Sequence, residues 1–376
     1  MKLLNLISSI VFFALILLSC SPVKEVKNDP IVQKLDSLMN TNTEFSGVIL
    51  VATDGSIRYH KAFGFRDYER KLPLDTANIF ELASVTKQFT AMVILMLKEE
   101  GKLDYDDSLS SYIPGLPYKG ITIRHLLTHT SGLPDYQDIM DQHWDKSKVA
   151  SNTDNIEYLI KYHPAPIFPP GEKYNYSNTG YMLLASVAEK ASGKDFIEFS
   201  RDRIFTPLQM SSTDIRTRDQ KRGISNFARG YIYVEDKHRY VAADSFPEFN
   251  YTIWLGNRKG PGRVSSTSSD LFKWDRALYQ ERLVKQATLQ EAFTPMKLNS
   301  DSLSNYGFGW EIIPDSDRGK IVFHTGDNPG YKTAIMRYID SDKTIIVLSN
   351  NASDSIRSIV SFIQKQLPIE SKVLSH

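Results

Sequence analysis

Residues 80–101 read FELASVTKQFTAMVILMLKEEG, a mixed start followed by a long apolar run that ends in glycine. The apolar residues fall at helical spacing, and Gly101 is a typical residue at a helix C-terminus. Ser84 and Lys87 are three positions apart, so they share one face of a helix and the lysine amine can reach the serine hydroxyl. We therefore predict one largely buried helix over 83–100, with this pair in its first turn.

The pair carries a chemical hypothesis, because a serine hydroxyl is a weak nucleophile until a neighbouring base takes its proton. A lysine is such a base where burial or nearby cations favour its neutral form. The dipole of the helix start favours negative charge on a substrate oxygen held beside Ser84. The motif is weak by itself, since Ser21-Pro-Val-Lys24 also matches it. Context separates the two, because only Ser84 precedes a long apolar helix.

Strand patterns lie toward both ends of the chain, with helical patterns between them. Residues 46–52 and 56–63, joined by the turn Asp54-Gly55, predict a hairpin, and 31–39 predicts a helix before it. Near the other end, four segments have strand patterns and one has a helical pattern: 306–313, 321–324, 333–339, 344–349 and the helix 356–367. We predict an α/β (α+β) fold, with an antiparallel sheet built from both termini, flanking helices, an inserted all-helical lobe and a cleft between lobe and sheet.

Two further segments hold polar residues suited to catalysis. Tyr176-Ser177-Asn178 precedes a helical pattern; a tyrosine beside a lysine can relay protons, and an asparagine can hold a substrate amide. His324-Thr325-Gly326 stands at the end of a predicted strand, whose edge can pair with an extended substrate and offer a backbone N–H to an oxyanion. Each segment taken alone also fits ordinary loop or turn residues.

Taken together, Ser-x-x-Lys, Tyr-x-Asn and His-Thr-Gly resemble, in order and separation, the three motifs of the serine β-lactamase and penicillin-binding protein superfamily. The resemblance runs from about Phe45 to Asn350. Residues 123–134 (IRHLLTHTSGLP) and 168–171 (FPPG) look like its class C β-lactamase-related branch. The set SVTK, YSN and HTG is similar to DD-carboxypeptidases of that branch. The resemblance implies a β-lactamase/transpeptidase-like fold and hydrolysis through an acyl-enzyme, with no cofactor.

The resemblance also implies a catalytic role for each matching residue. Ser84 is the expected nucleophile, and Lys87 helps to remove its proton. Tyr176 relays the proton to the leaving group and later activates water. The backbone N–H groups of Ser84 and Asp327 are the expected oxyanion hole, so Asp327 contributes by position rather than by its side chain.

Substrate binding is expected at Asn178, which orients the substrate amide, and at His324, Thr325 and Gly326, which hold its polar or carboxylate end. Two residues depart from the family pattern. Most β-lactamases carry Lys-Thr-Gly at this point, so His324 argues against efficient β-lactam hydrolysis. Asp327 is unusually acidic there and weakens the expectation of carboxylate-ended substrates.

The first twenty residues have the layout of an export signal. Met1-Lys2 is a short positive start, 3–18 is almost wholly apolar, and the run is too short for an ordinary transmembrane helix. Residues 17–20 (LLSC) resemble the lipobox of bacterial lipoproteins, and Cys20 is the single cysteine of the chain. We predict a signal peptide at 1–19, a lipid-anchored tether at 20–30 and a β-lactamase-related serine hydrolase domain at 31–376. The alternative is a plain cleaved signal.

Composition and charge exclude several classes of function. The chain has 45 Lys and Arg against 44 Asp and Glu and shows no dense basic run, so we expect no nucleic-acid partner. A single cysteine excludes an intrachain disulfide and a Cys-cluster metal site. His125 and His129 are spaced like zinc ligands on a helix, but no Glu in the metalloprotease pattern lies between them. We predict packing residues there and no metal site.

The preferred hypothesis is a serine hydrolase of D-amino-acid peptides of the cell wall, exported as a membrane-anchored lipoprotein on the periplasmic or cell-surface side. Its expected partners are a small peptide or ester substrate, peptidoglycan, and a membrane held through Cys20. A small-ester hydrolase and a weak β-lactamase use the same machinery and stay open. From a different class, the alternative is a catalytically silent penicillin- or peptidoglycan-binding or sensor lipoprotein. Whether Lys87 or Tyr176 is the general base also stays open.

Overall fold

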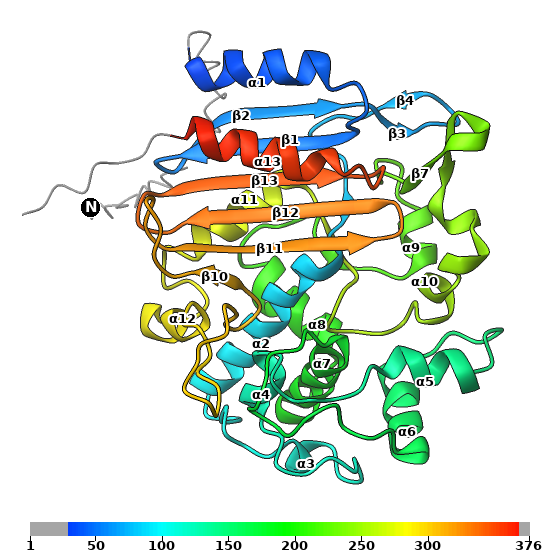
Figure 1. Cartoon of the computed structure of the whole chain (residues 1–376), viewed down its shortest axis with the longest axis vertical. Coiled ribbons are helices and arrows are strands. Elements are labelled where there is room, and N and C mark those ends of the chain that lie inside the picture. Colours follow the sequence, from blue (N-terminus) through cyan, green and yellow to red (C-terminus); the bar gives the residue numbers. More distant parts are fainter. Residues whose placement is uncertain (1–28, 368–376) are drawn as a thin grey trace, which may run out of the picture.

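One antiparallel sheet joins the two ends of the chain in the computed structural model, which describes residues 29–367. N-terminal β1 pairs with C-terminal β13, from Gly47 opposite Ser349 to Thr53 opposite Lys343. The predicted sheet built from both termini is therefore confirmed (Figure 1). In spatial order its strands are β10 (Glu311–Ile313), β11 (Ile321–Asn328), β12 (Tyr331–Tyr338), β13 (Lys343–Ser349), β1 (Gly47–Thr53) and β2 (Ser56–Phe63).

Alternation along the strands gives the sheet two buried faces. In β1, Ile49 and Val51 pack with α1 (Pro30–Thr41) and α13 (Ser355–Gln366). Val48 and Leu50 belong instead to the larger core shared with the helical lobe. Successive side chains of a strand point to opposite faces, so the almost unbroken apolar run of β1 predicts a strand covered on both sides. The predicted helices 31–39 and 356–367 are α1 and α13, and both are confirmed.

The segment between β2 and β10 forms the inserted lobe, and it is mostly helical (Figure 1). Its helices are α2 (Lys87–Glu99), α3 (Leu109–Tyr112), α4 (Ile123–Leu127), α5 (Tyr136–His143), α6 (Asn152–Tyr162), α7 (Asn178–Ser192), α8 (Phe196–Ser200), α9 (Arg218–Arg222), α10 (Tyr251–Trp254), α11 (Ser268–Ala277) and α12 (Gln286–Ala292).

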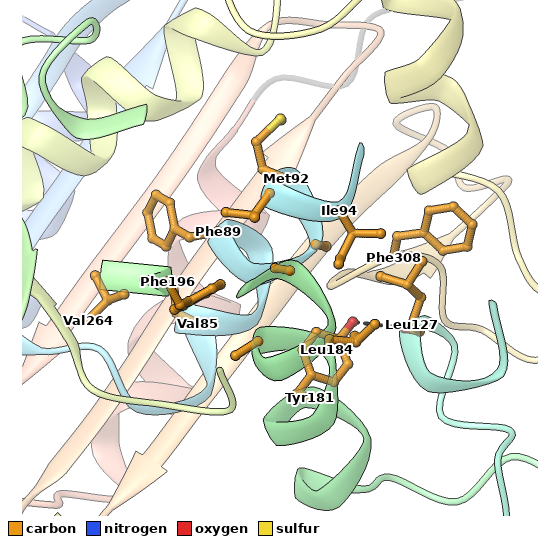
Figure 2. Close-up of a cluster of buried hydrophobic side chains, with 14 of the residues drawn as sticks. Val85, Phe89, Met92, Ile94, Leu127, Tyr181, Leu184, Phe196, Val264 and Phe308 are labelled. Carbon is orange, nitrogen blue, oxygen red and sulfur yellow. Dashed lines mark hydrogen bonds between the residues drawn. The ribbon is translucent and has the colours of Figure 1, made fainter. Parts of the chain in front are cut away.

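The centre of this lobe is the contact between α2 and α7 (Figure 2). Phe89 and Ile94 of α2 are buried, as are Tyr181 and Leu184 of α7. Every residue of α2 from Lys87 to Leu97 is buried, so this helix is enclosed by protein on all sides. An all-round apolar helix of this kind is a core element, as the sequence predicts.

The lobe also carries short strands that local periodicity does not reveal. β9 (Val264–Ser266) pairs with β5 (Phe80–Glu81) and β6 (Asp214–Ile215). Two hairpins add β3 (Phe65–Asp67) with β4 (Leu72–Pro73) and β7 (Tyr231–Val234) with β8 (Arg239–Ala242). Strands of two to four residues are too short for a clear period-2 signal. The lobe is therefore not purely helical, and the β5–β9 pair fixes the chain just before Ser84.

The predicted strand at 306–313 is shorter than expected, because only β10 is extended. The Gly307 N–H donates to the Trp310 carbonyl at 2.9 Å, and Gly309 adopts a left-handed φ of 79°. That conformation is cheap only for glycine and turns the chain. In the opposite direction, the strand predicted at 321–324 continues to Asn328 as β11.

Cys20, the predicted signal peptide and most of the predicted tether lie outside the described residues. Within residues 29–367, no helix combines the length and apolar character needed to span a bilayer.

Candidate active site

Ser84 lies in a tight 3₁₀ turn, Ala83–Thr86, that leads from β5 into α2. Ala83 has a left-handed φ of 49°, an unfavourable conformation for a residue with a side chain. Leu82 N–H donates to the Val264 carbonyl at 2.9 Å, and Val264 N–H donates to Thr86 Oγ1 at 3.1 Å. Because both sides of the turn are tied to β9, the strained backbone is held in place. The predicted helix thus begins as a 3₁₀ turn, and Ser84 is partly exposed between buried neighbours.

Lys87 is completely buried, and its amine contacts three oxygen atoms. Nζ lies 3.1 Å from Ser84 Oγ, 2.9 Å from Asn178 Oδ1 and 3.0 Å from the Pro261 carbonyl. No carboxylate of residues 29–367 lies within ion-pair distance of it. Burial lowers the pKa of Lys87 well below its ordinary value, and the charge of Arg258 lowers it further.

The neutral form of Lys87 fits these contacts. An uncharged amine has two N–H donors and one lone pair, while Asn178 Oδ1 and the Pro261 carbonyl are acceptors only. Both donors are then used, and the lone pair faces the Ser84 hydroxyl. The geometry therefore suits transfer of the hydroxyl proton from Ser84 to Lys87.

Tyr176 covers this pair with its ring. Lys87 Nζ lies 4.7 Å from the ring centre, and the phenol is within hydrogen-bonding reach of the Ser84 hydroxyl. Burial raises the pKa of Tyr176 above its ordinary value, although the contact with Ser84 lowers it somewhat. The phenol is therefore protonated at neutral pH. Since 39% of the residue's surface remains exposed, the site can be reached from solvent.

His129 holds Tyr176 in position, a role that is not evident from the sequence patterns. The residues on either side of Tyr176 both bond to it: Asn175 N–H donates to the His129 carbonyl at 2.9 Å, and Ser177 N–H donates to Nδ1 at 3.0 Å. The His129 ring packs on the Tyr176 ring with centres 4.3 Å apart. His129 is fully buried, and no described residue bonds its Nε2. The available signal was its place within 123–134, one of the stretches that carry the family resemblance.

His324 and Gly326 face inward from β11, while Thr325 and Asp327 are exposed. His324 Nε2 lies 2.9 Å from the hydroxyl of Tyr306, a second residue whose place in the site is not evident from the sequence patterns. Burial lowers the pKa of His324 to about 3, so its ring is neutral at physiological pH. A side chain at Gly326 would collide with the Leu82 carbonyl, so glycine lets β11 run directly against the turn that carries Ser84.

The edge of β11 beside Ser84 lacks a second strand partner among residues 29–367. β10 pairs only with residues 321–323 of β11, so within the described chain the stretch from His324 to Asn328 has a strand partner on one side only, β12. An extended peptide can pair with such a free edge. The predicted oxyanion donors, the N–H groups of Ser84 and Asp327, belong to the two segments that meet at Gly326.

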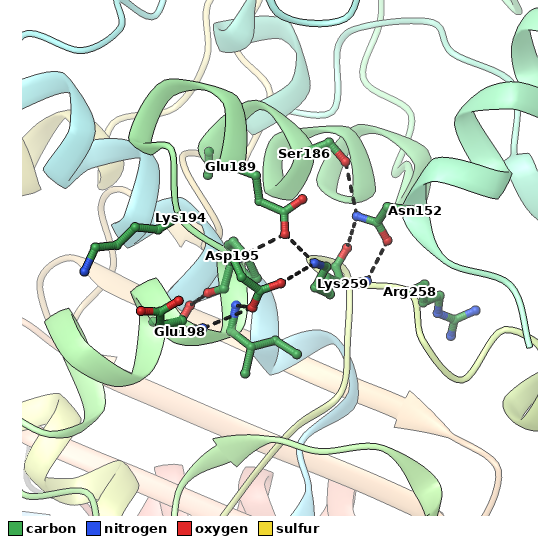
Figure 3. Close-up of polar contacts among 12 residues, drawn as sticks. Asn152, Ser186, Glu189, Lys194, Asp195, Glu198, Arg258 and Lys259 are labelled. Carbon is green, nitrogen blue, oxygen red and sulfur yellow. Dashed lines mark hydrogen bonds and ion pairs between the residues drawn. The ribbon is translucent and has the colours of Figure 1, made fainter.

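The loop 258–263, which supplies the Pro261 carbonyl to Lys87, is anchored by polar contacts (Figure 3). Asn152 of α6 bonds the backbone of Lys259 twice, accepting from its N–H at 2.7 Å and donating to its carbonyl at 3.1 Å. Lys259 Nζ pairs with Glu189 and, at 2.8 Å, with Asp195. These contacts fix a loop whose place beside the site is not evident from the sequence patterns.

The structure thus brings Ser84, Lys87, Tyr176 and Asn178 into one cluster, although they come from distant parts of the sequence. In the described part of the chain no group of three or more His, Cys, Asp or Glu side chains is arranged to hold a metal ion.

Comparison with known proteins identifies the family. The sequence profile described as Beta-lactamase matches residues 32–358. Penicillin-binding protein 4* of Bacillus subtilis (strain 168) is 42% identical over 325 residues, which cover 86% of this chain and 72% of that protein. The chain belongs to the Beta-lactamase family. It is a serine hydrolase with the fold shared by β-lactamases and penicillin-binding proteins.

Solved structures of the family agree with this fold. A penicillin-binding protein from Bacillus halodurans superposes with a TM-score of 0.76 at 28% identity, covering 89% of this chain and 99% of that one. The D-amino acid amidase of Ochrobactrum anthropi SV3 reaches a TM-score of 0.69 at 24% identity, covering 89% of this chain and 97% of that one. The similarity to the D-amino acid amidase concerns the fold and not the substrate.

Proposed function

We propose that this β-lactamase-family hydrolase cleaves D-amino-acid peptides through an acyl-enzyme on Ser84. The observation that carries the proposal is the environment of Lys87, which is buried, bonded to Ser84 and without a carboxylate partner. A lysine in this setting is a base and not a structural cation. The motifs SVTK, YSN and HTG, which resemble those of DD-carboxypeptidases, support a peptide substrate.

In the proposed acylation step, Ser84 Oγ attacks the scissile carbonyl carbon while its proton passes to Lys87 Nζ. The carbonyl oxygen becomes an oxyanion that accepts hydrogen bonds from the N–H groups of Ser84 and Asp327. Tyr176 then protonates the leaving amine as the carbon–nitrogen bond breaks, and the protonated Lys87 resupplies the phenol. The product is an ester between Ser84 and the acyl group.

Hydrolysis of this ester completes the cycle. A water molecule attacks the ester carbonyl, its proton returns through the Tyr176–Lys87 pair, and the Ser84 hydroxyl is restored. Asn178 orients the substrate in both steps. Its Oδ1 is occupied by Lys87, while no described residue accepts a hydrogen bond from Nδ2, which leaves that donor for a substrate carbonyl.

A neutral His324 weakens the binding of any substrate that has a carboxylate beside this motif, whether a β-lactam or a peptide with a free C-terminal D-Ala. A lysine at this point of the motif supplies a positive charge for a substrate carboxylate, whereas His324 is uncharged above a pKa of about 3. The exposed Asp327 next to the site repels a carboxylate further. We therefore expect penicillin to acylate Ser84 more slowly than it would with a lysine at position 324.

The test is intact-protein mass spectrometry after incubation with a fluorescent penicillin and, separately, a fluorophosphonate. We expect adducts on wild type and none on Ser84→Ala. Peptides that end in D-Ala-D-Ala and p-nitrophenyl esters are compared in parallel. Peptide hydrolysis with Ser84→Ala reduced by roughly 10⁴-fold or more supports the proposal.

Three results contradict parts of it. Ester hydrolysis without peptide hydrolysis replaces the peptidase by a small-ester hydrolase. Rapid decay of the penicillin adduct replaces it by a β-lactamase. A wild-type protein that neither reagent labels and that leaves peptides and esters intact is a silent binding or sensor protein.

We also propose export and lipid anchoring, on the basis of the apolar run 3–18 and Cys20. Metabolic labelling with an alkyne fatty acid tests this directly. Label on wild type and not on Cys20→Ser supports the anchor. Labelling of neither protein overturns it.

A further inference from the structure

A cavity of about 510 Å³ lies beyond the C-terminal end of β11, where Asn328 and Pro329 line it. Its walls come from the β11–β12 turn, the β3–β4 hairpin, α9 and the loop 258–263. Eight Arg or Lys side chains line it against four Asp or Glu side chains, an excess of four positive charges. The whole chain carries a net charge of only +1, so positive charge is concentrated here.

The carboxylates of this cavity are already engaged. Asp244 pairs with Arg218 at 2.8 Å and with Arg229 at 2.9 Å, and Glu81 pairs with Lys221 at 2.5 Å. Three further cations that line it, Arg66, Arg258 and Arg263, make no ion pair within the described part of the chain. The internal carboxylates therefore do not neutralise the cavity.

Arg263 provides a second, independent observation. It is 6% exposed and adopts a left-handed φ of 83°. Its Nε and Nη1 donate to the carbonyls of Arg216 and Arg258 at 3.3 and 3.2 Å, whereas Nη2 is buried without a partner. Nε of Arg66 is likewise buried and unbonded. Both residues line the cavity, so the guanidinium groups of Arg66 and Arg263 add positive charge to its wall that forms no ion pair within the described chain.

The walls of the cavity are continuous with the candidate active site. Asn328 directly follows Asp327 and donates to Glu81 Oε1 at 2.6 Å, and Glu81 lies three residues before Ser84. The loop whose Pro261 carbonyl contacts Lys87 ends in Arg263. In the proposed mechanism the leaving group lies toward His324 and Thr325, and the scissile carbonyl lies at Asp327. The acyl portion of the substrate then extends past Asn328 toward the cavity.

We propose that this cationic pocket binds the carboxylates of an acidic peptide on the acyl side of the scissile bond. The planar forks of Arg66 and Arg263 suit bidentate contacts to carboxylates. His324 supplies no positive charge beside the leaving group, where a lysine would supply one. The positive charge lies instead in the pocket, at the acyl end of the substrate. The inference rests on the proposed function, because it requires that Ser84 is acylated by peptides.

The test measures binding separately from turnover. On Ser84→Ala protein, the dissociation constants of acetyl-Glu-Glu-D-Ala-D-Ala and acetyl-Gln-Gln-D-Ala-D-Ala are compared by isothermal titration calorimetry. We expect the acidic peptide to bind at least about tenfold more tightly than the neutral one. In Arg66→Gln the ratio of the two dissociation constants is expected to fall by about tenfold. Arg263→Gln is expected to have the same effect on a folded variant. Because Arg66 is only half-buried, Arg66→Gln tests the pocket even where Arg263→Gln fails to fold.

The matched control is Arg357→Gln, which removes the same charge from the exposed face of α13, away from the pocket. It is expected to leave the preference unchanged. Equal binding of the two peptides, or an equal loss in Arg66→Gln and Arg357→Gln, overturns the pocket. Tighter binding of inorganic tripolyphosphate with the same dependence on Arg66 overturns the peptide as its occupant.

The failure of the proposed function looks different. In that case wild-type protein hydrolyses neither peptide, whatever the binding constants are. A preference for the acidic peptide in binding without any turnover would keep the pocket and reject the peptidase.

Discussion

Lys87 and Lys221 are both largely removed from solvent, and both contact the segment 81–84: Lys87 reaches Ser84, and Lys221 reaches Glu81. Lys87 faces Ser84, Asn178 and a backbone carbonyl, with no carboxylate in reach. Lys221 of α9 instead pairs with Glu81, three residues before Ser84, and the two side chains are 14% and 13% exposed. The surroundings of Lys87 favour a neutral amine. At Lys221, by contrast, the Glu81 carboxylate stabilises the charged amine.

The difference shows that the partner of a lysine in a low-dielectric environment decides whether its amine is neutral or charged. Burial lowers the pKa of both, because a charged amine loses its hydration. Glu81 opposes that effect at Lys221 through its charge and its hydrogen bond. Lys87 has only the distant Asp135 to raise its pKa, and Arg258 acts in the opposite direction. A base results at one position and a structural ion pair at the other.

The largest expected effect comes from removing the base. Lys87→Gln keeps a side chain of similar length but cannot take the proton of Ser84. The rate of acylation by penicillin or by a D-alanyl peptide is expected to fall by roughly 10² to 10⁴-fold. Stopped-flow fluorescence with a labelled penicillin measures it. An acylation rate within a few fold of wild type would transfer the role of base to another group.

The next effect concerns stability and separates the two lysines. Lys221→Met leaves the largely buried Glu81 without its cationic partner and with Asn328 as its remaining side-chain donor, so the free energy of unfolding is expected to fall by about 3 to 5 kcal/mol. Lys87→Met leaves no carboxylate without a partner, so the free energy of unfolding is expected to fall much less. Urea unfolding followed by fluorescence gives both values. The double variant Lys221→Met with Glu81→Gln serves as the control, because it removes both charges and should recover most of the loss.

The pH dependence of acylation tests the ionisation state of the same groups. Lys87 is active as the neutral amine, so kcat/KM is expected to rise about tenfold per pH unit below its pKa and then level off. Since burial lowers that pKa, the plateau should begin well below pH 10.5. Because the pKa of Tyr176 is raised, the phenol should cause no change at neutral pH.

Tyr176→Phe is the matched variant for this profile. It should lower the plateau and keep the rising limb in the same place. A limb that disappears in Tyr176→Phe would make the Lys87–Tyr176 pair the titrating unit rather than Lys87 alone.

The smallest expected effect is at His129, which bonds the backbone on both sides of Tyr176. His129→Phe keeps the ring contact but removes the acceptor for the Ser177 N–H, at a cost of roughly 1 to 3 kcal/mol. Thermal unfolding measures this loss, and kcat should fall while KM changes little, because Tyr176 is displaced. His129→Asn restores an acceptor near Nδ1 and is expected to recover part of kcat. Equal losses in both variants would reduce His129 to a packing residue.

Much of the fold follows from local patterns in the sequence. The apolar run of 46–52, the alternation of 56–63, the turn at Asp54-Gly55 and the C-terminal strand patterns predict the sheet, because side-chain pattern reflects which faces are buried. The apolar run after Lys87 likewise predicts the buried helix α2. The short strands of the lobe could not be predicted, since two or three residues are fixed by their pairing partners and not by their own pattern.

The sequence by itself determined the order of the three motifs, the sheet built from both ends and the nature of the groups that meet at Ser84. The tertiary structure alone decided what each group is beside. Asn178 lies 91 residues from Lys87 and Pro261 lies 174 residues away, yet both contact its amine. The His129–Tyr176 contact and the cationic pocket also depend on segments far apart in the chain. Periodicity and propensity describe neighbours in sequence, whereas pKa, hydrogen bonding and surface charge depend on neighbours in space.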